Sequence, residues 1–546
     1  MIARVREGFP FPPRGWPLVA MLALFLLTGL FGHEPWKNDD ALTIGVVSDM
    51  LTRGHWLTPH LADRPYPDAP LYYWIAALAG AVFSLLLPLH DAVRLASGLC
   101  VALTLWLIYR ASRELHAHEE APHEFAIASV LAMAGSLGFL IHAHEAQPML
   151  VALAAHSGAY WAIALLPRKP DRAAIVFALA IFAGVLGNGI APMLPLLPLA
   201  ILAVALAGNR VRAALLLGAG TSAGIVGASL WPLIIYFAAP AYFQQWLSAE
   251  AAQFTNLLSA PRAAIDFASM ALWFAWPALP LALWTLRSKR RLLREFPYAL
   301  PIGATLIAWL TLSLTLAPRS TSALLLLPPL ALLAAAGVAT LRRGAANAFD
   351  WFGIMSFSVF AIFIWIGWSA MVFGWPERLA GRVVKLAPGF SGQFAPIAFT
   401  LALAGTVAWI WLIFTGQEKR SPWRGLVHWL GGLTTLWLLL MTLWLPWIEH
   451  GRSYRSVGLA IKAALPANSG CVLGRNIPDA NRALIDYYAG VAVRRDSGAA
   501  ARECRYLIVQ RDSRGSREAL AGWEVVTEAR RPSERREHFI LYRRAG

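Results

Sequence analysis

Long apolar segments recur along this chain from about residue 16 to residue 447, separated by short polar stretches. Many of them run for 16 to 23 residues, which is the length a helix needs to cross a hydrocarbon core of roughly 30 Å. Helices are expected because a segment inside lipid must satisfy its own backbone hydrogen bonds. The pattern predicts a polytopic α-helical membrane protein with about thirteen spans. The predicted spans are 16–32, 93–112, 124–141, 148–166, 173–187, 190–207, 213–236, 267–286, 297–316, 322–341, 351–373, 394–414 and 425–447.

Residues 70–89 are apolar enough to form one more span. Counting them would move every later loop to the other side and place the basic loops outside, whereas short cytoplasmic loops are the ones that carry Lys and Arg. We therefore expect 70–89 to be an interfacial or re-entrant segment within an external loop, 33–92. Within that loop, residues 41–54 suit a helix lying in the membrane interface, with Leu42 and Val46 on the apolar side and Asp49 and Arg53 on the polar side.

The composition supports a membrane protein, with 58% hydrophobic residues, 14% charged residues and a mean hydropathy of +0.54, against about 25% charge in soluble domains. The net charge of +16 does not indicate a nucleic-acid partner, because the basic residues lie in short loops between apolar segments. The same rule places the N-terminus, with Arg4, Arg6 and Arg14, in the cytoplasm. We expect a bacterial inner-membrane protein whose first span is a retained anchor.

The C-terminal residues, 448–546, differ from the transmembrane domain formed by 1–447. They alternate between helix and strand patterns, which predicts a small α/β domain on the periplasmic side. Cys471 and Cys504 each begin a predicted strand. In an oxidising periplasm they can pair, and two unpaired buried thiols are the alternative. The predicted helices cover 453–465 and 479–489, and the predicted strands cover 471–473, 491–495, 506–509, 523–528 and 538–543.

An acidic patch at residues 34–40 directly follows the first span and contains Asp39 and Asp40. A pair of carboxylates at a membrane surface is costly to desolvate, which suggests a functional reason for it. A carboxylate in this position can take a proton from an acceptor hydroxyl. The alternative is that the two residues cap the helix that follows, and one pair can serve both purposes.

The segments around this patch resemble a known family, the GT-C glycosyltransferases of the protein O-mannosyltransferase type, and in style the lipid A aminoarabinose transferases among them. The family motifs W-x-P-D-E, G-D-W-L-x-P and P-Y-x-x-K-P-P-L-Y-Y-W are similar to Trp36–Asp40, Gly54–Pro59 and Pro65–Trp74. The first 75 residues carry the specific part of the resemblance. Weaker similarity extends it to Arg94–Leu99, Gly184–Gly189 and Arg319–Pro329.

This resemblance implies an inverting enzyme that moves a sugar from a polyprenyl phosphate to a lipid, glycan or protein acceptor at the outer face, with no cofactor. It assigns the catalytic carboxylate to Asp39, with Asp40 in the second acidic position. Glu145 is the candidate for a further acidic residue in the second external loop, with Gln147 as a non-ionising alternative. Glu250 lies in the third external loop. The set formed by Glu145 and its two neighbouring histidines is only a weak signal for a divalent metal site.

The chain departs from the family at two lysines that are expected to hold the donor phosphate. Ala69, preceded by Asp68, replaces one, and Asn188 replaces the other. Each loss removes charge-assisted hydrogen bonds of about 1.5–3 kcal/mol. Arg319 is the first candidate to replace them and Arg64 another, whereas a snorkelling role is the alternative for Arg319. The aromatic candidates for binding the sugar or the prenyl chain are Tyr66, Tyr72, Tyr73 and Trp74.

Two other functions are compatible with parts of this pattern. The missing lysines favour a non-catalytic binder or translocator of polyprenyl-linked glycans, and the acidic pair opposes it. A secondary transporter would carry ionisable residues at the middle of its spans, and the predicted spans hold almost none. The motifs do not select a sugar, an acceptor or a prenyl length.

Overall fold

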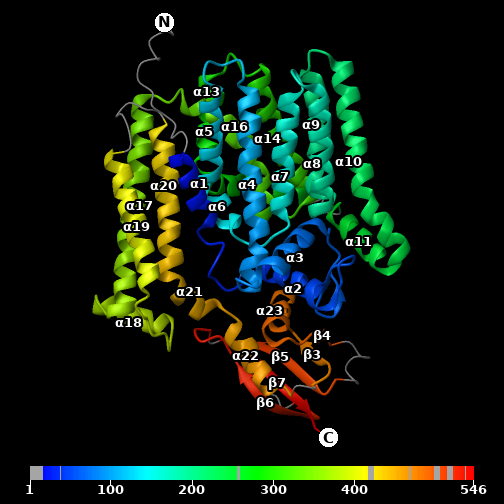
Figure 1. The fold of residues 1–546 in the computed structure, drawn as a ribbon, viewed down its shortest axis with the longest axis vertical. Coiled ribbons are helices and arrows are strands. Elements are labelled where there is room, and N and C mark those ends of the chain that lie inside the picture. The colour runs from blue at the N-terminus through cyan, green and yellow to red at the C-terminus, as the bar shows by residue number, and fades with distance from the viewer. Residues whose placement is uncertain are drawn as a thin grey trace.

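The structure, a computed structural model, describes residues 16–36, 38–254, 259–415, 423–466, 469–496, 504–512, 520–534 and 536–545. Arg4, Arg6 and Arg14, which predict the side of the N-terminus, and Lys37 of the acidic patch lie outside these ranges. In Figure 1, long helices run side by side in a bundle, and a small domain containing a sheet lies at one end of it. The C-terminus lies in that small domain.

Every predicted span coincides with a helix or a broken helix. Within the described ranges, eight helical segments are long and apolar enough to cross a membrane, and two bent pairs bring the number to ten. The bent pairs are α5 (Pro122–Ala134) with α6 (Leu137–Ala143), at 69°, and α12 (Ala260–Phe274) with α13 (Ala278–Ser288), at 99°. The long segments are α4 (Leu89–Leu115), α8 (Pro170–Asn188), α10 (Arg210–Ala238), α14 (Phe296–Thr315), α15 (Ser320–Ala323) with α16 (Leu327–Val338), α17 (Arg343–Phe373), α19 (Pro396–Thr415), and α20 (Arg424–Leu439) with α21 (Leu445–Arg452).

Shorter apolar helices account for the three remaining predicted spans. They are α1 (Trp16–Leu27), α7 (Met149–Leu165) and α9 (Leu196–Leu206). The total of thirteen crossings therefore stays a prediction. A fourth short helix, α3 (Leu71–Phe83), corresponds to the segment expected to lie in the interface. Figure 1 shows it beside α2, at the end of the bundle that faces the small domain and outside the row of long helices.

Helix α2 (Asn38–Arg53) corrects one expectation. It packs against α3 on one side and against α23 (Asp479–Ala489) of the small domain on the other. Asp49, expected to face water, is fully buried and accepts a hydrogen bond from the Arg53 guanidinium (2.7 Å). The helix exists as predicted, but it does not lie with one face in water, because the C-terminal domain covers that face.

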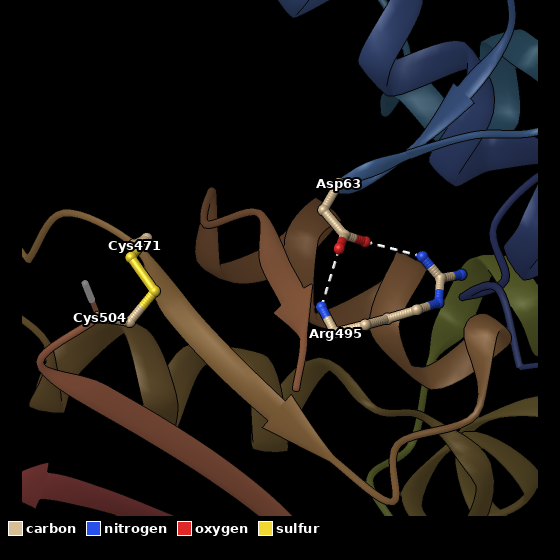
Figure 2. The surroundings of a disulfide bond; sticks show 4 residues. All are labelled: Asp63, Cys471, Arg495 and Cys504. Carbon is tan, nitrogen blue, oxygen red and sulfur yellow. Dashed lines mark hydrogen bonds and ion pairs between the residues drawn. A yellow bond between two sulfur atoms is a disulfide. The ribbon is translucent and has the colours of Figure 1, made fainter. Parts of the chain in front are cut away.

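The C-terminal domain contains every helix and strand predicted for it. The sheet has the order β4-β3-β5-β7-β6, with β3 parallel to β4 and β5 and with β7 antiparallel to β5 and β6. Cys471 and Cys504 form a disulfide that joins the segments entering β3 and β5 (Figure 2). The elements are α22 (Arg455–Ala464), β3 (Val472–Arg475), α23, β4 (Val493–Arg495), β5 (Tyr506–Asp512), β6 (Trp523–Ala529) and β7 (Glu537–Arg544).

Ion pairs and close packing hold this domain against the first external loop. Arg53 forms a two-pronged ion pair with Asp486 of α23 (2.7 and 2.8 Å). Asp63 lies in the turn between the short strands β1 (His60–Leu61) and β2 (Arg64–Pro65), and it accepts hydrogen bonds from both the backbone and the guanidinium of Arg495 (Figure 2). The C-terminal domain therefore forms a lid over the loop that carries the acidic patch.

Candidate active site

The centre of the candidate site is a buried ion pair between Arg94 of α4 and Asp40 of α2. Arg94 is 0% and Asp40 1% exposed. The guanidinium donates two hydrogen bonds to the Asp40 carboxylate, 2.6 Å to Oδ2 and 3.1 Å to Oδ1. Asp40 Oδ1 also accepts a hydrogen bond from the backbone N–H of Ala146 (2.8 Å). Burial alone would raise the pKa of Asp40, but the charge and hydrogen bonds of Arg94 hold that pKa below its ordinary value.

The rest of the Arg94 guanidinium fixes the start of the loop. It donates to the carbonyl oxygen of His33 (2.7 Å) and to Asp91 Oδ1 (3.0 Å), while Asp91 Oδ2 accepts the backbone N–H of Gly32 (2.9 Å). One arginine thus ties the exit from α1, the first turn of α2 and the turn after α6 to α4. Asp40, predicted as a second catalytic carboxylate, is fully engaged in this network, and we assign it a positioning role.

Asp39, next to Asp40 in the first turn of α2, is partly exposed. Its pKa is raised, first by burial and then by the negative charge of Glu145, whereas the charges of His142 and Arg319 act in the opposite direction. His142 belongs to the last turn of α6, Glu145 to the turn that follows it, and Arg319 directly precedes α15, so groups from separate segments act on the pKa of Asp39. A carboxylate with a raised pKa beside a cation is a typical arrangement for a general base.

The turn that carries Glu145 is held by its own hydrogen bonds. His142 Nδ1 lies 3.1 Å from Glu145 Oε2, and the Ser97 hydroxyl donates to the Glu145 carbonyl oxygen (2.7 Å). The Gln147 side-chain amide donates to the His142 carbonyl oxygen (2.9 Å) and is buried. Glu145 is therefore held in place as the group whose negative charge raises the pKa of Asp39.

The second histidine of this turn, His144, lies against backbone carbonyl oxygens. His144 uses its ring nitrogens near the carbonyl oxygens of Leu140 (3.2 Å) and Phe25 (2.8 Å). In the part of the chain that the structure describes, no group of three or more His, Cys, Asp or Glu side chains is arranged to hold a metal ion. The charges of His142 and Glu145 both act on the pKa of Asp39.

Arg319 is the arginine whose positive charge lowers the pKa of Asp39. Its side chain is exposed, its charge acts on both Asp39 and Tyr66, and its guanidinium has no hydrogen bond or ion pair with another described residue. Arg53 is already bound to Asp49 and Asp486. Arg64 lies on the hairpin beside the C-terminal domain, where its charge acts on Arg482, so it is not among the groups at Asp39.

Carboxyl groups stand near both positions where the family carries lysines. Asp68 accepts a hydrogen bond from the Tyr73 hydroxyl (2.7 Å), and burial raises its pKa. Glu250 accepts the backbone N–H of Ile190 (3.0 Å), and burial raises its pKa to about 7. Gly189 has a φ of +81°, and a Cβ there would collide with Glu250. The carboxyl of Glu250 thus rests on the backbone that follows Asn188.

The aromatic predictions are corrected in part. Tyr72 and Tyr73 are 0% and 2% exposed, and their hydroxyls bond to Ser97 (2.6 Å) and Asp68. They support the loop and have no free face for stacking on a ligand. Trp74 donates its Nε1–H to the Trp56 carbonyl oxygen (2.7 Å). Tyr66 is only partly buried and lies within the electrostatic range of Asp39 and Arg319, so it remains a candidate for ligand contact.

An apolar groove that sequence reasoning did not anticipate lies beside Glu250. It has a volume of about 380 Å³ and is lined by side chains of α8, α9, α10 and α11 (Pro240–Ala252). Ile190, whose backbone binds Glu250, forms part of its wall, together with Trp246 and Phe243. Nothing in the spacing of these apolar residues distinguishes them from ordinary packing, so the sequence carried no signal for the groove. Asn188 lies nearby, with its amide on Met149 Sδ (3.3 Å).

Comparisons with known proteins show where this architecture occurs. No protein-family model matches the chain. An undecaprenyl phosphate-α-4-amino-4-deoxy-L-arabinose arabinosyl transferase of Pseudomonas fluorescens is 31% identical over 99 residues, which is 18% of this chain and 17% of the relative. A transferase of the same name from Pseudomonas aeruginosa is 34% identical over 99 residues. The chain therefore aligns with less than a fifth of the length of these curated relatives.

The likeness in structure is far more extensive. The crystal structure of ArnT from Cupriavidus metallidurans bound to undecaprenyl phosphate superposes with a TM-score of 0.64, covering 96% of this chain and 97% of ArnT at 15% identity. The same protein in the apo state gives a TM-score of 0.63 at 14% identity. The chain thus has the ArnT fold, and the fold expected from the sequence resemblance is confirmed.

We predict that Arg94→Leu strongly destabilises the protein. It leaves the Asp40 and Asp91 carboxylates buried without their cation, a loss of about 3–5 kcal/mol in the free energy of unfolding. Thermal unfolding of the detergent-solubilised protein measures it. Arg113→Leu, an exposed arginine in the last turn of the same helix, is the matched control. The double variant Arg94→Leu/Asp40→Leu should recover part of the loss, and equal unfolding temperatures for Arg94→Leu and wild type would contradict the assignment.

Proposed function

We propose that this protein is an inverting membrane glycosyltransferase that moves a sugar from a polyprenyl-phosphate donor to an acceptor at the end of the bundle covered by the C-terminal domain. The observation that carries the proposal is that Asp39, a partly exposed carboxylate with a raised pKa, lies within the electrostatic reach of Arg319, an exposed arginine with no hydrogen bond or ion pair to another residue that the structure describes. Further support comes from the ArnT fold, since the matched ArnT structure holds undecaprenyl phosphate. The aligned relatives are transferases that use an undecaprenyl-phosphate-linked aminoarabinose.

The proposed chemistry is a single displacement. Asp39 accepts the proton of the acceptor hydroxyl as the hydroxyl oxygen attacks the anomeric carbon of the donor sugar. The bond between that carbon and the phosphate oxygen breaks, and the polyprenyl phosphate leaves with the electron pair from the opposite side, which inverts the centre. The guanidinium of Arg319 stabilises the charge that develops on the phosphate. The step as written uses side chains alone and no cofactor.

The apolar groove beside Glu250 suits the lipid part of the donor. Its walls expose almost only carbon atoms, and it lies between helices that face the membrane. Prenyl chains are stabilised in such a groove by burial of about 0.8 kcal/mol per methylene-sized group. Glu250, which accepts the backbone N–H of the groove residue Ile190, and Asp68, whose charge acts on Glu250, bring carboxyl groups rather than lysines to this region. This is the observation that favours the second candidate function, a protein that binds polyprenyl-linked glycans without transferring the sugar.

Activity of Asp39→Asn decides between the two functions. With undecaprenyl-phosphate-linked aminoarabinose as the donor, wild type in membranes should release undecaprenyl phosphate, and Asp39→Asn should do so about 10²- to 10⁴-fold more slowly, because an amide cannot accept the proton. Asp171→Asn, an exposed aspartate in the first turn of α8, should retain full activity. Release by Asp39→Asn at the wild-type rate would remove Asp39 from the chemistry, and binding of the donor without release by wild type would support the non-catalytic function.

We predict that Glu145→Gln shifts the acid limb of the pH–rate profile to lower pH. The negative charge of Glu145 is the largest cause, after burial, of the raised pKa of Asp39, so removing that charge lowers the pKa. Asp39 then stays deprotonated, and able to act as a base, at more acidic pH. A profile of kcat/KM measured from pH 4 to pH 8 reports the limb directly. Glu120→Gln, on an exposed loop, should leave the limb in place, and an unmoved or upward-shifted limb in Glu145→Gln would contradict this electrostatic coupling.

We further propose that the N-terminus is cytoplasmic and that the C-terminal domain is periplasmic in a bacterial inner membrane. The clustered basic loops support this orientation, and so does the Cys471–Cys504 disulfide, which requires an oxidising compartment. Alkaline phosphatase, active only in the periplasm, should be active when fused after residue 546 and inactive when fused after residue 290. The opposite pattern would invert the assignment.

A further inference from the structure

A small cavity lies near the end of α4, away from the candidate active site. It has a volume of about 170 Å³ and is bounded by α4, by the last turns of α7 and by the first turns of α8. Arg110 lines it and follows Arg94 by about four and a half turns of α4, so it lies roughly 24 Å from Arg94 along the helix axis. The cavity and the candidate active site therefore lie at opposite ends of the same helix.

Three basic side chains line this cavity, and none of its lining residues is acidic. They are Arg110 of α4, Lys169 directly before α8 and Arg172 in the first turn of α8. Among the described residues, none of the three side chains has a hydrogen bond or an ion pair. The neighbouring Arg168 differs, because it is paired with Glu114 (3.5 Å). The cavity thus carries positive charge that no described part of the chain neutralises.

Two buried donors on this cavity have no hydrogen-bond partner in the described part of the chain. They are the Nε of Arg110 and the indole Nε1 of Trp161. The Arg110 guanidinium lies over the rings of Trp106 and Trp161, 5.2 and 4.6 Å from their centres, and the two indoles pack edge to face, with ring centres 5.4 Å apart. These contacts fix the guanidinium by cation–π attraction. Buried N–H groups also need acceptors, and an anionic ligand in the cavity supplies acceptor oxygens to both.

An exposed apolar surface leads from this cavity toward the middle of the bundle. On α4, Leu103 and Trp106 are exposed and share one face of the helix with Arg110, because residues three, four and seven apart align. On α8, Ile175 and Leu179 are exposed one turn apart. Cations at the end of an apolar stripe match a phospholipid, with its phosphate at the cations and its acyl chains along the stripe. A free anion would make no use of the stripe.

Snorkelling accounts for only part of this arrangement. Lys169 and Arg172 are exposed, and long basic side chains at the end of a span often reach toward water. The Nε of Arg110 and the Nε1 of Trp161 are buried instead. A ligand that reaches into the cavity explains the buried donors and the exposed cations together.

We propose that this cavity binds the phosphodiester headgroup of an anionic phospholipid from the leaflet at this end of the bundle. Arg110 and Trp161 donate hydrogen bonds to the phosphate oxygens, and Lys169 and Arg172 balance the negative charge from the exposed side. The bound lipid joins the ends of α4 and α8 that face away from the candidate active site. It stabilises the protein without contact to the sugar donor or the acceptor, so the proposal does not rest on the transferase function.

Native mass spectrometry of the full-length protein tests this binding, with phosphatidylglycerol as the anionic probe and phosphatidylcholine as the zwitterionic one. Wild type should retain phosphatidylglycerol more strongly. Lys169→Gln/Arg172→Gln should weaken that binding about tenfold or more, because two cations beside the phosphate are lost. Arg290→Gln/Arg291→Gln removes the same charge from two exposed arginines that follow α13 and do not line the cavity, and it should bind as wild type does.

Three outcomes of this experiment count against the proposal. Equal binding of phosphatidylglycerol by Lys169→Gln/Arg172→Gln and wild type overturns the site. Equal retention of the two lipids by wild type overturns the preference for an anionic headgroup. Displacement of bound phosphatidylglycerol by millimolar inorganic phosphate overturns the lipid as the ligand and leaves a site for a free anion.

Trp161→Phe tests the buried donor separately. It keeps an aromatic ring beside the Arg110 guanidinium but removes the N–H, so it should lower the affinity for phosphatidylglycerol about threefold or more. Thermal unfolding with and without the lipid gives a second readout, because a ligand that binds only the folded protein raises its unfolding temperature. The rise should be the same in Asp39→Asn as in wild type and less than about half as large in Trp161→Phe and in Lys169→Gln/Arg172→Gln. A rise of equal size in all four proteins contradicts the proposal.

Discussion

The Arg94–Asp40 ion pair is the interaction on which the half of this protein next to the C-terminal domain depends. The Arg94 guanidinium has 0% exposure, and a buried charge of this kind needs ionic and hydrogen-bonding partners. Its partners are the carboxylates of Asp40 and Asp91 and the carbonyl oxygen of His33, each of which accepts a hydrogen bond from it. These acceptors belong to three different segments. The pair therefore converts a loop of more than fifty residues between two helices into a fixed platform, on which Asp39 and the turn bearing Glu145 face each other.

Two adjacent aspartates consequently perform different tasks. Asp40 is held as an anion by Arg94, with its pKa lowered, and contributes geometry. Asp39 lies one residue earlier in the same helical turn, faces partly outward and has a raised pKa, which is what a proton acceptor needs. The two aspartates have different surroundings because successive residues of a helix are rotated by about 100° about its axis. Asp40 faces Arg94 of α4, whereas Asp39 is partly exposed. Helix α2 also receives two acidic groups in its first turn, where the helix dipole favours them.

Much of the fold could be predicted from the sequence, because it follows from local regularities. The length of each apolar segment predicted the helical spans, and the alternation of helix and strand patterns predicted the elements of the C-terminal domain. The failures concern features set by tertiary contacts. Tyr72 and Tyr73 look like ligand-binding aromatics in a motif, yet they are buried, with their hydroxyls bonded to Ser97 and Asp68. The amphipathic pattern of α2 suggested a water-facing side, but it is the side that binds α23.

The candidate site was predicted in its residues more than in its roles. The charges of Glu145 and Arg319 act on the pKa of Asp39 although the three residues are far apart in sequence, and their catalytic and binding roles stay predictions. The importance of Arg94 could have been inferred from the rule that an ionisable residue inside a predicted span needs a partner. The two expected lysines are absent, and the carboxyl groups of Asp68 and Glu250 lie near their positions instead. The sequence alone does not reveal this, because only the structure places Glu250 against the backbone after Asn188.

The most direct test of the account is an experimental structure of this protein with undecaprenyl phosphate bound. We expect phosphate density in hydrogen-bond contact with the Arg319 guanidinium and next to Asp39, with the prenyl chain in the groove lined by Ile190 and Trp246. Density for the phosphate on Arg64 or in another part of the molecule, with Arg319 unoccupied, would contradict it.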